Sequence, residues 1–247
     1  MADFKYFLKD SIRKVVDFSQ TDQSKGLPPP PLEKPCPENA RKIDLPGSEE
    51  WETAVRPIPI EKAIADRKSH RAPSKGNMAL SELSFLLWAT QGVRKKEGMY
   101  HALRTVPSAG CRHSFETYIA AFKVDSLEKG IYRYLPLTHQ LLVVSVVDDL
   151  EIKVARMALG QGFAGKSAVT FIWTTITSRM EWRYGPAAYK VIALDAGHVC
   201  QNLYLACEAV GCGTCAIAAY DQEYSDALLG IDGEEEFTIY MAPVSKL

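Results

Sequence analysis

The sequence predicts an α+β fold in which helices flank a mixed, mostly antiparallel central sheet. Strand and helix patterns are interleaved after residue 60, but they lack the regular βαβ alternation of a parallel sheet. The apolar fraction of 47% in 247 residues is large enough for a sizeable core. We therefore expect one folded domain over residues 60–247, preceded over residues 1–59 by a helix and a proline-rich arm.

The N-terminal region is expected to differ from the rest of the chain. Apolar residues at near-helical spacing in residues 2–18 predict an amphipathic helix. Residues 19–60 are rich in proline, with four in succession at 28–31, which prevents regular structure and favours extended polyproline segments. The sequence therefore predicts an arm that wraps around the domain.

The domain itself is expected to contain strands and helices in mixed order. Sequence periodicity predicts helices over 60–66, 81–90 and 150–159, and strands over 117–124, 130–136, 140–147, 168–176 and 236–244. Asp148 or Asp149 can cap the helix that starts at residue 150. A further helix is expected from near Ala187, with Asp195 as the cap of a successor helix that ends before Gly211.

Charge and hydropathy limit the classes of partner. The net charge is −1 with acidic and basic residues intermixed, so neither nucleic acid nor an anionic membrane surface is favoured. We expect a small molecule, a peptide or a protein instead. No apolar run approaches the ~20 residues needed to span a bilayer, and the N-terminus lacks the apolar core of a secretory signal. These features predict a cytoplasmic protein.

The six cysteines are spread through a chain that is large enough to fold without disulfides, so we expect reduced thiols. Cys212 and Cys215 form the one C-x-x-C pair. A zinc site would need a second pair or spaced histidines, and the sequence has neither. We therefore expect no metal site.

A dense polar cluster occurs at Arg67-Lys-Ser-His-Arg71. Two guanidinium groups and a hydroxyl within five residues are well suited to a phosphate, because arginine forms bidentate charge-assisted hydrogen bonds. A solvated charge run between two elements is the alternative, and the local sequence leaves it open.

Two turns of small residues could let backbone amides approach a planar ligand, one at Pro107-Ser-Ala-Gly110 and one at Gly211-Cys-Gly213. The second superficially matches a dinucleotide-binding fingerprint. That motif follows a strand and opens a helix, whereas here a helix precedes and a short apolar strand is expected to follow. We therefore exclude a Rossmann site.

Five short motifs in one order resemble the nitroreductase-like flavoprotein family, and more closely its SagB-type dehydrogenase branch. They are the 67–71 cluster, the 107–110 turn, the Asp195-Ala-Gly-His198 and Gln201-Asn202 pattern, the 211–213 turn and the C-terminal Pro243-Val-Ser-Lys246. The resemblance covers residues 60–246. It implies a nitroreductase-like fold, FMN as cofactor, NADH or NADPH as electron donor, and a homodimer with the flavin at the subunit interface.

The resemblance also implies roles for individual residues. Arg67, Ser69, Arg71 and Lys246 would hold the flavin phosphate and ribityl chain; Pro107, Ser108, Ala109 and Gly110 would contact the ring; and Ala216, Ile217, Ala218 and Ala219 would offer an amide to flavin N5. From the residues alone, segment 216–219 could equally be an edge strand with small residues for close packing. The long helix that carries His198 is expected at the dimer interface, with packing as its first role.

Two positions depart from the family pattern. Cys111 stands where nitroreductases commonly have Asn, although the Arg112-His113 pair that follows fits the SagB-type branch. Arg183 replaces the Lys of the catalytic Lys-Tyr pair in azoline-oxidising relatives, and its high pKa makes arginine a poor general base. Tyr184 could still donate a proton or orient the substrate.

The sequence thus predicts an FMN-dependent oxidoreductase that passes hydride through flavin N5 in a ping-pong mechanism. Two alternatives remain open. One is a SagB-type peptide azoline dehydrogenase, in which Tyr184 would act without a Lys partner. The other is a non-catalytic flavin-binding or scaffold subunit.

Overall fold

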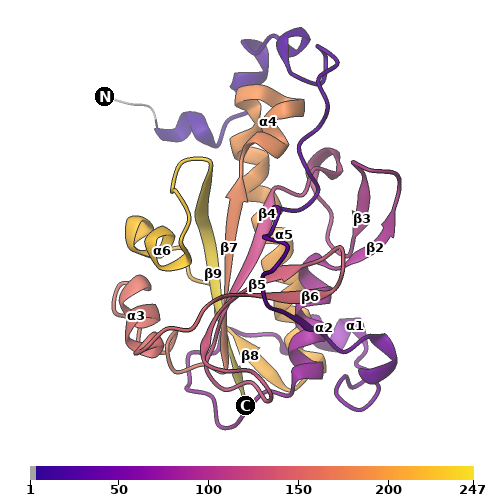
Figure 1. The fold of residues 1–247 in the computed structure, drawn as a ribbon. Helices are drawn as coiled ribbons and strands as arrows, with labels where there is room; N and C mark the ends of the chain where they lie inside the picture. The colour runs from indigo at the N-terminus through magenta and orange to yellow at the C-terminus, as the bar shows by residue number, and fades with distance from the viewer. Residues whose placement is uncertain (1–3) are drawn as a thin grey trace.

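The computed structural model describes residues 4–247 and centres on one seven-stranded sheet (Figure 1). The strand order is β1-β6-β5-β4-β7-β9-β8. These strands are β1 (Lys42–Asp44), β4 (Phe115–Ala121), β5 (Gly130–Leu135), β6 (Gln140–Ser145), β7 (Val169–Ile176), β8 (Cys212–Thr214) and β9 (Glu236–Lys246). Neighbouring strands pair antiparallel throughout, and β2 (Val93–Lys96) and β3 (Ala102–Arg104) form a separate antiparallel pair.

Helices cover both faces of this sheet. They are α1 (Ile60–Asp66), α2 (Leu80–Gln91), α3 (Leu150–Met157), α4 (Ser178–Tyr184), α5 (Ala188–Ala209) and α6 (Gln222–Leu229). Along β7, Phe171 and Trp173 join the core cluster that contains buried residues of α2 and α5, whereas Ile172 joins the cluster that contains those of α3 and α6. Side chains of a strand alternate between faces, so β7 is buried on both sides. The predicted α+β fold is confirmed.

The helix expected over residues 2–18 is not present in the described part of that range. Two short 3₁₀ helices, Phe4–Phe7 and Ser11–Lys14, take its place, and residues 2–3 lie outside the described residues. Phe7, Leu8 and Val15 are exposed. Because most helical stability in proteins comes from packing an apolar face, this segment has little to hold a continuous helix.

Parts of the segment 21–44 bond to the rest of the chain. Trp182 Nε1 of α4 donates to Leu27 O at 2.9 Å, and Arg104 Nη2 donates to Leu32 O at 2.7 Å. The prediction that regular structure is absent before residue 60 is wrong at β1, which lies in the proline-free stretch between Pro37 and Pro46. There β1 adds to the edge of the sheet beside β6.

Two expectations about the later elements are also wrong. Asp195 does not cap a new helix, because α5 runs without a break from Ala188 to Ala209. The strand expected at 216–219 lies earlier, at Cys212–Thr214, and within that segment only Ile217 forms a bridge, with Met241. Asp149 does precede α3, but with a left-handed backbone and no side-chain cap bond. Within residues 4–247 no helix is long and apolar enough to cross a bilayer.

Candidate functional site

The charged segment 67–71 lies beside the edge strand β8. Ser69 forms a parallel bridge with Thr214, and His70 N donates to Thr214 O at 2.9 Å. Thr214 in turn pairs with Val244 of β9. The segment therefore extends the sheet by one more partner, and it brings Arg67 and Arg71 to the same edge as the C-terminal strand.

Tyr204 of α5 joins three of the residues that the sequence assigned to the cofactor. Its hydroxyl lies 2.9 Å from Ser69 Oγ and accepts a hydrogen bond from Ala216 N at 3.0 Å. The Arg67 guanidinium carbon lies 5.3 Å from the centroid of its ring, within cation–π distance. We call Arg67, Ser69, Tyr204 and Ala216 the Tyr204 junction. Sequence reasoning missed Tyr204. The one feature that could have indicated it is an aromatic side chain with a hydroxyl group in a helix that is otherwise rich in small residues.

The amides of segment 216–219 are not equivalent. Ala216 N is bound by Tyr204, and Ile217 N donates to Met241 O at 2.8 Å. Ala218 and Ala219 are exposed, and neither main-chain N–H donates to another residue in the range 4–247. The donors free for a ligand are therefore these last two amides.

Lys246 lies at the same sheet edge, but its ammonium group already has partners. Nζ donates to Glu82 Oε1 at 2.7 Å and to Val210 O at 2.9 Å. These contacts join β9 to α2 and to the end of α5. Direct contact between Lys246 and a phosphate would require the Glu82 ion pair to open.

The 107–110 turn is held by a buried carboxylate of α5. Asp195 Oδ2 accepts a hydrogen bond from Ala109 N at 3.0 Å, and its carboxylate also bonds the side chain of Ser108. Burial raises the pKa of Asp195, while these hydrogen bonds act in the opposite direction. Ser108 Oγ in addition accepts from His113 N at 2.9 Å. Of the four predicted ring contacts in this turn, Pro107 and Gly110 are exposed.

Gly110 brings the turn directly against α4. Its φ is +57°, and a Cβ placed there would lie 2.6 Å from Arg183 Cδ and 2.7 Å from Tyr184 Oη. Only glycine adopts this conformation without strain and leaves room for both side chains. The structure thus brings the predicted Tyr184 together with the predicted ring-contacting turn. We call residues 108–110 with Arg183 and Tyr184 the Gly110 turn.

His113 is a buried, neutral residue behind this turn. Burial, with Arg104 and Arg112 nearby, lowers its pKa to about 3. Its Nε2 lies 3.4 Å from Cys111 Sγ. An imidazole that stays neutral at physiological pH and is 3% exposed packs the turn rather than reaching a ligand.

The Tyr204 junction and the Gly110 turn lie on different sides of α5. Asp195 and Tyr204 are nine residues apart, which in an α-helix is about 13.5 Å along the axis and half a turn around it. Contacts made by Asp195 therefore point away from those made by Tyr204. Within one chain the two groups of residues therefore lie apart.

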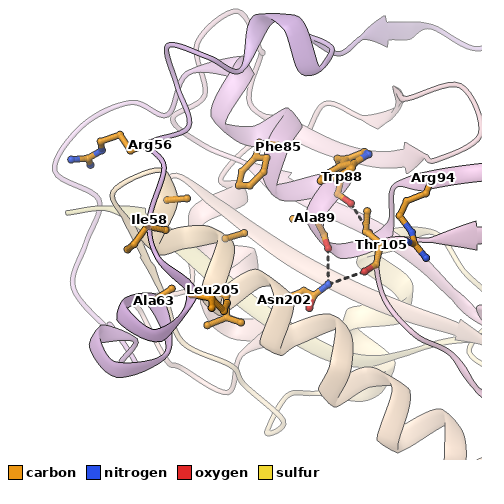
Figure 2. Close-up of a pocket in the computed structure, with 13 residues that line it drawn as sticks. Arg56, Ile58, Ala63, Phe85, Trp88, Ala89, Arg94, Thr105, Asn202 and Leu205 are labelled. Carbon is orange, nitrogen blue, oxygen red and sulfur yellow. Dashed lines mark hydrogen bonds between the residues drawn. The ribbon is translucent and has the colours of Figure 1, made fainter.

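A cavity of about 450 Å³ lies between α1, α2 and α5, and the predicted cofactor residues do not line it (Figure 2). Phe85 and Trp88 form part of its wall. Asn202 lies at the same place and donates from Nδ2 to Ala89 O at 2.9 Å. Asn202 thus joins α5 to α2. His198, also on α5, is half exposed, and its Nδ1 lies 3.7 Å from Asp195 Oδ1.

Comparisons with known proteins agree with this fold. The family model described as the nitroreductase family matches residues 64–245. A protein of Methanocaldococcus jannaschii assigned to the nitroreductases is 30% identical over 207 residues, which are 83% of this chain and 96% of that protein. The trifolitoxin-processing protein TfxB of Rhizobium leguminosarum is 25% identical over 170 residues, 66% of this chain and 46% of that longer protein.

Solved structures share the architecture. A Ralstonia eutropha protein assigned to the nitroreductases has a TM-score of 0.68 and 26% identity, covering 89% of this chain and 98% of its own. The Escherichia coli microcin synthetase McbBCD complex, with truncated pro-MccB17 bound, has a TM-score of 0.61 and 17% identity. The match covers 98% of this chain and 92% of that chain. An Exiguobacterium sibiricum protein in complex with FMN has a TM-score of 0.55 and 12% identity, and the match covers 77% of this chain and 89% of that chain.

The match to the trifolitoxin-processing protein agrees with the resemblance to the SagB-type branch that the sequence motifs indicated. The family match extends over more than half of the chain and includes both the Tyr204 junction and the Gly110 turn. The chain therefore belongs to the nitroreductase family.

Proposed function

We propose that this protein is an FMN-dependent oxidoreductase that takes electrons from NADH or NADPH and passes them to a second substrate in a ping-pong mechanism. When bound, FMN supplies the hydride chemistry through its N5 atom. The observation that carries this proposal is the Tyr204 junction. There one hydroxyl bonds both to Ser69 of the cationic segment 67–71 and to Ala216 of the segment whose last two amides lack partners.

The residues at this edge fit the cofactor. Arg67 and Arg71 offer guanidinium groups that can bind a phosphate bidentately, and Ser69 adds a neutral donor. Ala218 and Ala219 offer main-chain N–H groups without internal partners. Lys246 contributes positive charge from its place beside Glu82. The donor set thus provides one end for an anion and another for the polar edge of a ring.

The protein is further proposed to act as a homodimer with the flavin at the interface. The half-turn between Asp195 and Tyr204 supports this, since a second copy can bring its Gly110 turn to the first copy's Tyr204 junction. Tyr189 and Leu194 of α5 are exposed apolar residues that such a partner would cover. Leu194→Glu should yield monomers by analytical ultracentrifugation, and a wild-type protein that is monomeric with flavin bound would contradict the dimer.

We propose that the residues of this site position the cofactor and the substrate and do not react with them covalently. Asp195 fixes the Gly110 turn through Ala109 N, and Tyr184 Oη beside Gly110 can orient the substrate or deliver a proton. Arginine is in general a poor general base, so we assign Arg183 no such role.

The first test is spectroscopic. Purified protein should be yellow or should bind added FMN, and NADH or NADPH should bleach the flavin band, which a nitroaromatic or quinone should then restore. Bleaching without restoration would leave the second alternative, a flavin-binding or scaffold subunit without turnover. Colourless protein that refuses FMN would overturn the proposal.

A peptide azoline dehydrogenase is the second candidate function. The similarity to the trifolitoxin-processing protein and to the microcin synthetase complex favours it. Tyr184 would then act beside Arg183 in place of the Lys-Tyr pair. Incubation with an azoline peptide decides this, because azole formation without added pyridine nucleotide would support it.

A further inference from the structure

Three arginines surround the Gly110 turn. Arg183 packs directly on it, with Nε 2.8 Å from where a Cβ of Gly110 would lie. Arg112 follows the turn in sequence and is only 6% exposed, with its guanidinium carbon 4.7 Å from the centroid of the Trp182 ring. Arg179 is buried beneath them, and its main-chain oxygen accepts from Arg112 Nε at 3.4 Å. Positive charge is therefore concentrated on this side of the turn.

The charge on Arg179 is compensated, but that on Arg112 and Arg183 is not. Arg179 Nη2 lies 2.6 Å from Glu116 Oε1. Within residues 4–247, no carboxylate oxygen lies within 4.0 Å of the Arg112 or Arg183 side-chain nitrogens. Burial lowers the pKa of Arg112, and the like charges of Arg183 and Arg179 lower it further. Burying an unpaired charge is unfavourable unless a ligand pairs it.

Other buried arginines of the same protein show the contrast. Arg104 donates from Nη1 to Gln91 and from Nη2 to Leu32 O, both at 2.7 Å. Arg133 donates from Nη2 to Lys34 O at 2.9 Å and to a second arm carbonyl. Both terminal nitrogens of Arg112, by comparison, lack an acceptor among residues 4–247. Arg104 and Arg133 thus have acceptors at their terminal nitrogens and none at Nε, whereas Arg112 has an acceptor at Nε and none at its terminal nitrogens.

We propose that the second substrate of this enzyme carries a carboxylate, which Arg112 and Arg183 bind beside the Gly110 turn. A guanidinium fork matches a carboxylate bidentately, and two adjacent forks without internal acids select an anion over a neutral isostere. Trp182 and Tyr184, which lie under Arg112 and Arg183, add aromatic surface for the body of the substrate. This inference rests on the proposed oxidoreductase function and names its substrate class.

A matched pair of acceptors tests it on the wild-type holoenzyme. 4-Nitrobenzoate and 4-nitrobenzamide have the same shape and differ in charge. Each turnover takes one hydride from NADH or NADPH and one proton from solvent, and it converts the nitro group to a nitroso group while the oxygen that is lost leaves as water. Since a hydrogen bond to a charged group contributes about tenfold to a hundredfold in affinity, kcat/KM should be at least about tenfold higher for the acid. Added salt should reduce that ratio. Equal values, or a preference for the amide, would overturn the proposal.

Variants locate the preference. Arg112→Gln and Arg183→Gln should each lower the acid-to-amide ratio toward one. Arg156→Gln is the matched control. It removes a guanidinium from helix α3, which lies away from α4 (Figure 1) and where Arg156 lies 4.4 Å from the Tyr224 ring of α6, so the ratio should stay unchanged. A ratio that survives in both test variants would place the carboxylate elsewhere. Because Arg112 is buried, the exposed Arg183 keeps the test decisive if Arg112→Gln fails to fold.

Failure of the proposed function can be told apart from failure of this inference. If neither acceptor is reduced, oxidoreductase activity on nitro groups is absent, yet benzoate and benzamide can still be titrated against tryptophan fluorescence, with Trp182→Phe separating the Trp182 signal from that of the other three tryptophans. Benzoate should then quench, and benzamide at the same concentration should not. Flavin loss in Arg112→Gln or Arg183→Gln would instead assign these arginines to the cofactor and would contradict the substrate role.

Discussion

The Tyr204 junction and the Gly110 turn are both held by α5, but by opposite means. At the junction, exposed or half-exposed residues of three segments meet on one hydroxyl, and the sheet edge supplies the geometry. At the turn, a buried carboxylate and a left-handed glycine fix the backbone. The junction is thus adjustable and the turn rigid. This difference suits a site in which one part grips a cofactor and the other shapes the space for a substrate.

The largest effect is expected from Gly110→Ala. A Cβ there meets Arg183 and Tyr184 and forces a strained backbone, so we expect a loss of about 2–5 kcal/mol in unfolding free energy. Gly160→Ala is the control, because φ there is +82° with no heavy atom within 4 Å of the added Cβ. It should cost only about 1–2 kcal/mol. Urea unfolding measures both, and equal losses would mean that the turn is not rigid.

Arg67→Ala should come next and act on the cofactor instead of on stability. Loss of a charge-assisted phosphate contact should weaken FMN binding by about 1.5–3 kcal/mol, while the thermal unfolding of the apoprotein changes little. Lys68→Ala, which removes an exposed neighbouring charge, is the control. Full flavin occupancy in Arg67→Ala, measured by absorbance after dialysis, would separate the junction from the cofactor.

Tyr204→Phe should have a smaller effect of the same kind. It removes the hydroxyl that binds Ser69 and Ala216 N but keeps the ring under Arg67, so FMN should bind more weakly by about 1–2 kcal/mol. Tyr132→Phe on β5, which removes a hydroxyl that donates to Glu128 O, serves as the control. Unchanged affinity in isothermal titration would show that the junction does not need its central hydroxyl.

The smallest effect concerns pH. Because burial raises the pKa of Asp195 above its ordinary value of 3.8, its stabilising contribution is complete below that value and is lost as pH rises through the folded-state pKa. The wild type should therefore lose stability relative to Asp195→Asn as pH rises through this window. Hydrogen bonds from the N–H groups of Glu236 and Glu234 lower the pKa of Asp232. The wild type should therefore gain stability relative to Asp232→Asn as pH rises. Urea unfolding from about pH 2.5 to about 7 covers the window above 3.8 for Asp195 and the window below 3.8 for Asp232, and parallel curves would contradict the assignment.

The sequence predicted what depends on local pattern. The helix that buries Leu83, Leu86 and Leu87 and the strand over 168–176 followed from periodicity and β-branching, because their burial matches their spacing. The N-terminal segment has helical spacing too, yet it meets residues 185–190 only in part and leaves Phe7, Leu8 and Val15 exposed. Spacing alone does not reveal whether a partner surface exists.

The candidate site was predictable in its parts and not in its assembly. The polar cluster and the Pro107 turn were visible from composition, since their residue types are unusual. Asp195, by contrast, has the sequence signal of a helix cap, but its partner, Ala109 N, is 86 residues away. Tyr204 likewise meets Ser69 across 135 residues. Such pairings follow from strand order, which one sequence does not specify.

The proline-rich arm has a consequence for any attempt to shorten this protein. Carbonyl oxygens of Leu32, Lys34 and Pro35 are the acceptors for the buried Arg104 and Arg133. A version trimmed to begin at residue 64, where the family match begins, would remove these carbonyl acceptors and leave Arg104 with Gln91 Oε1 alone, at about 1–3 kcal/mol for each donor left unsatisfied. The arm is therefore part of the wall of the domain, and a shortened version that keeps these acceptors starts no later than residue 32.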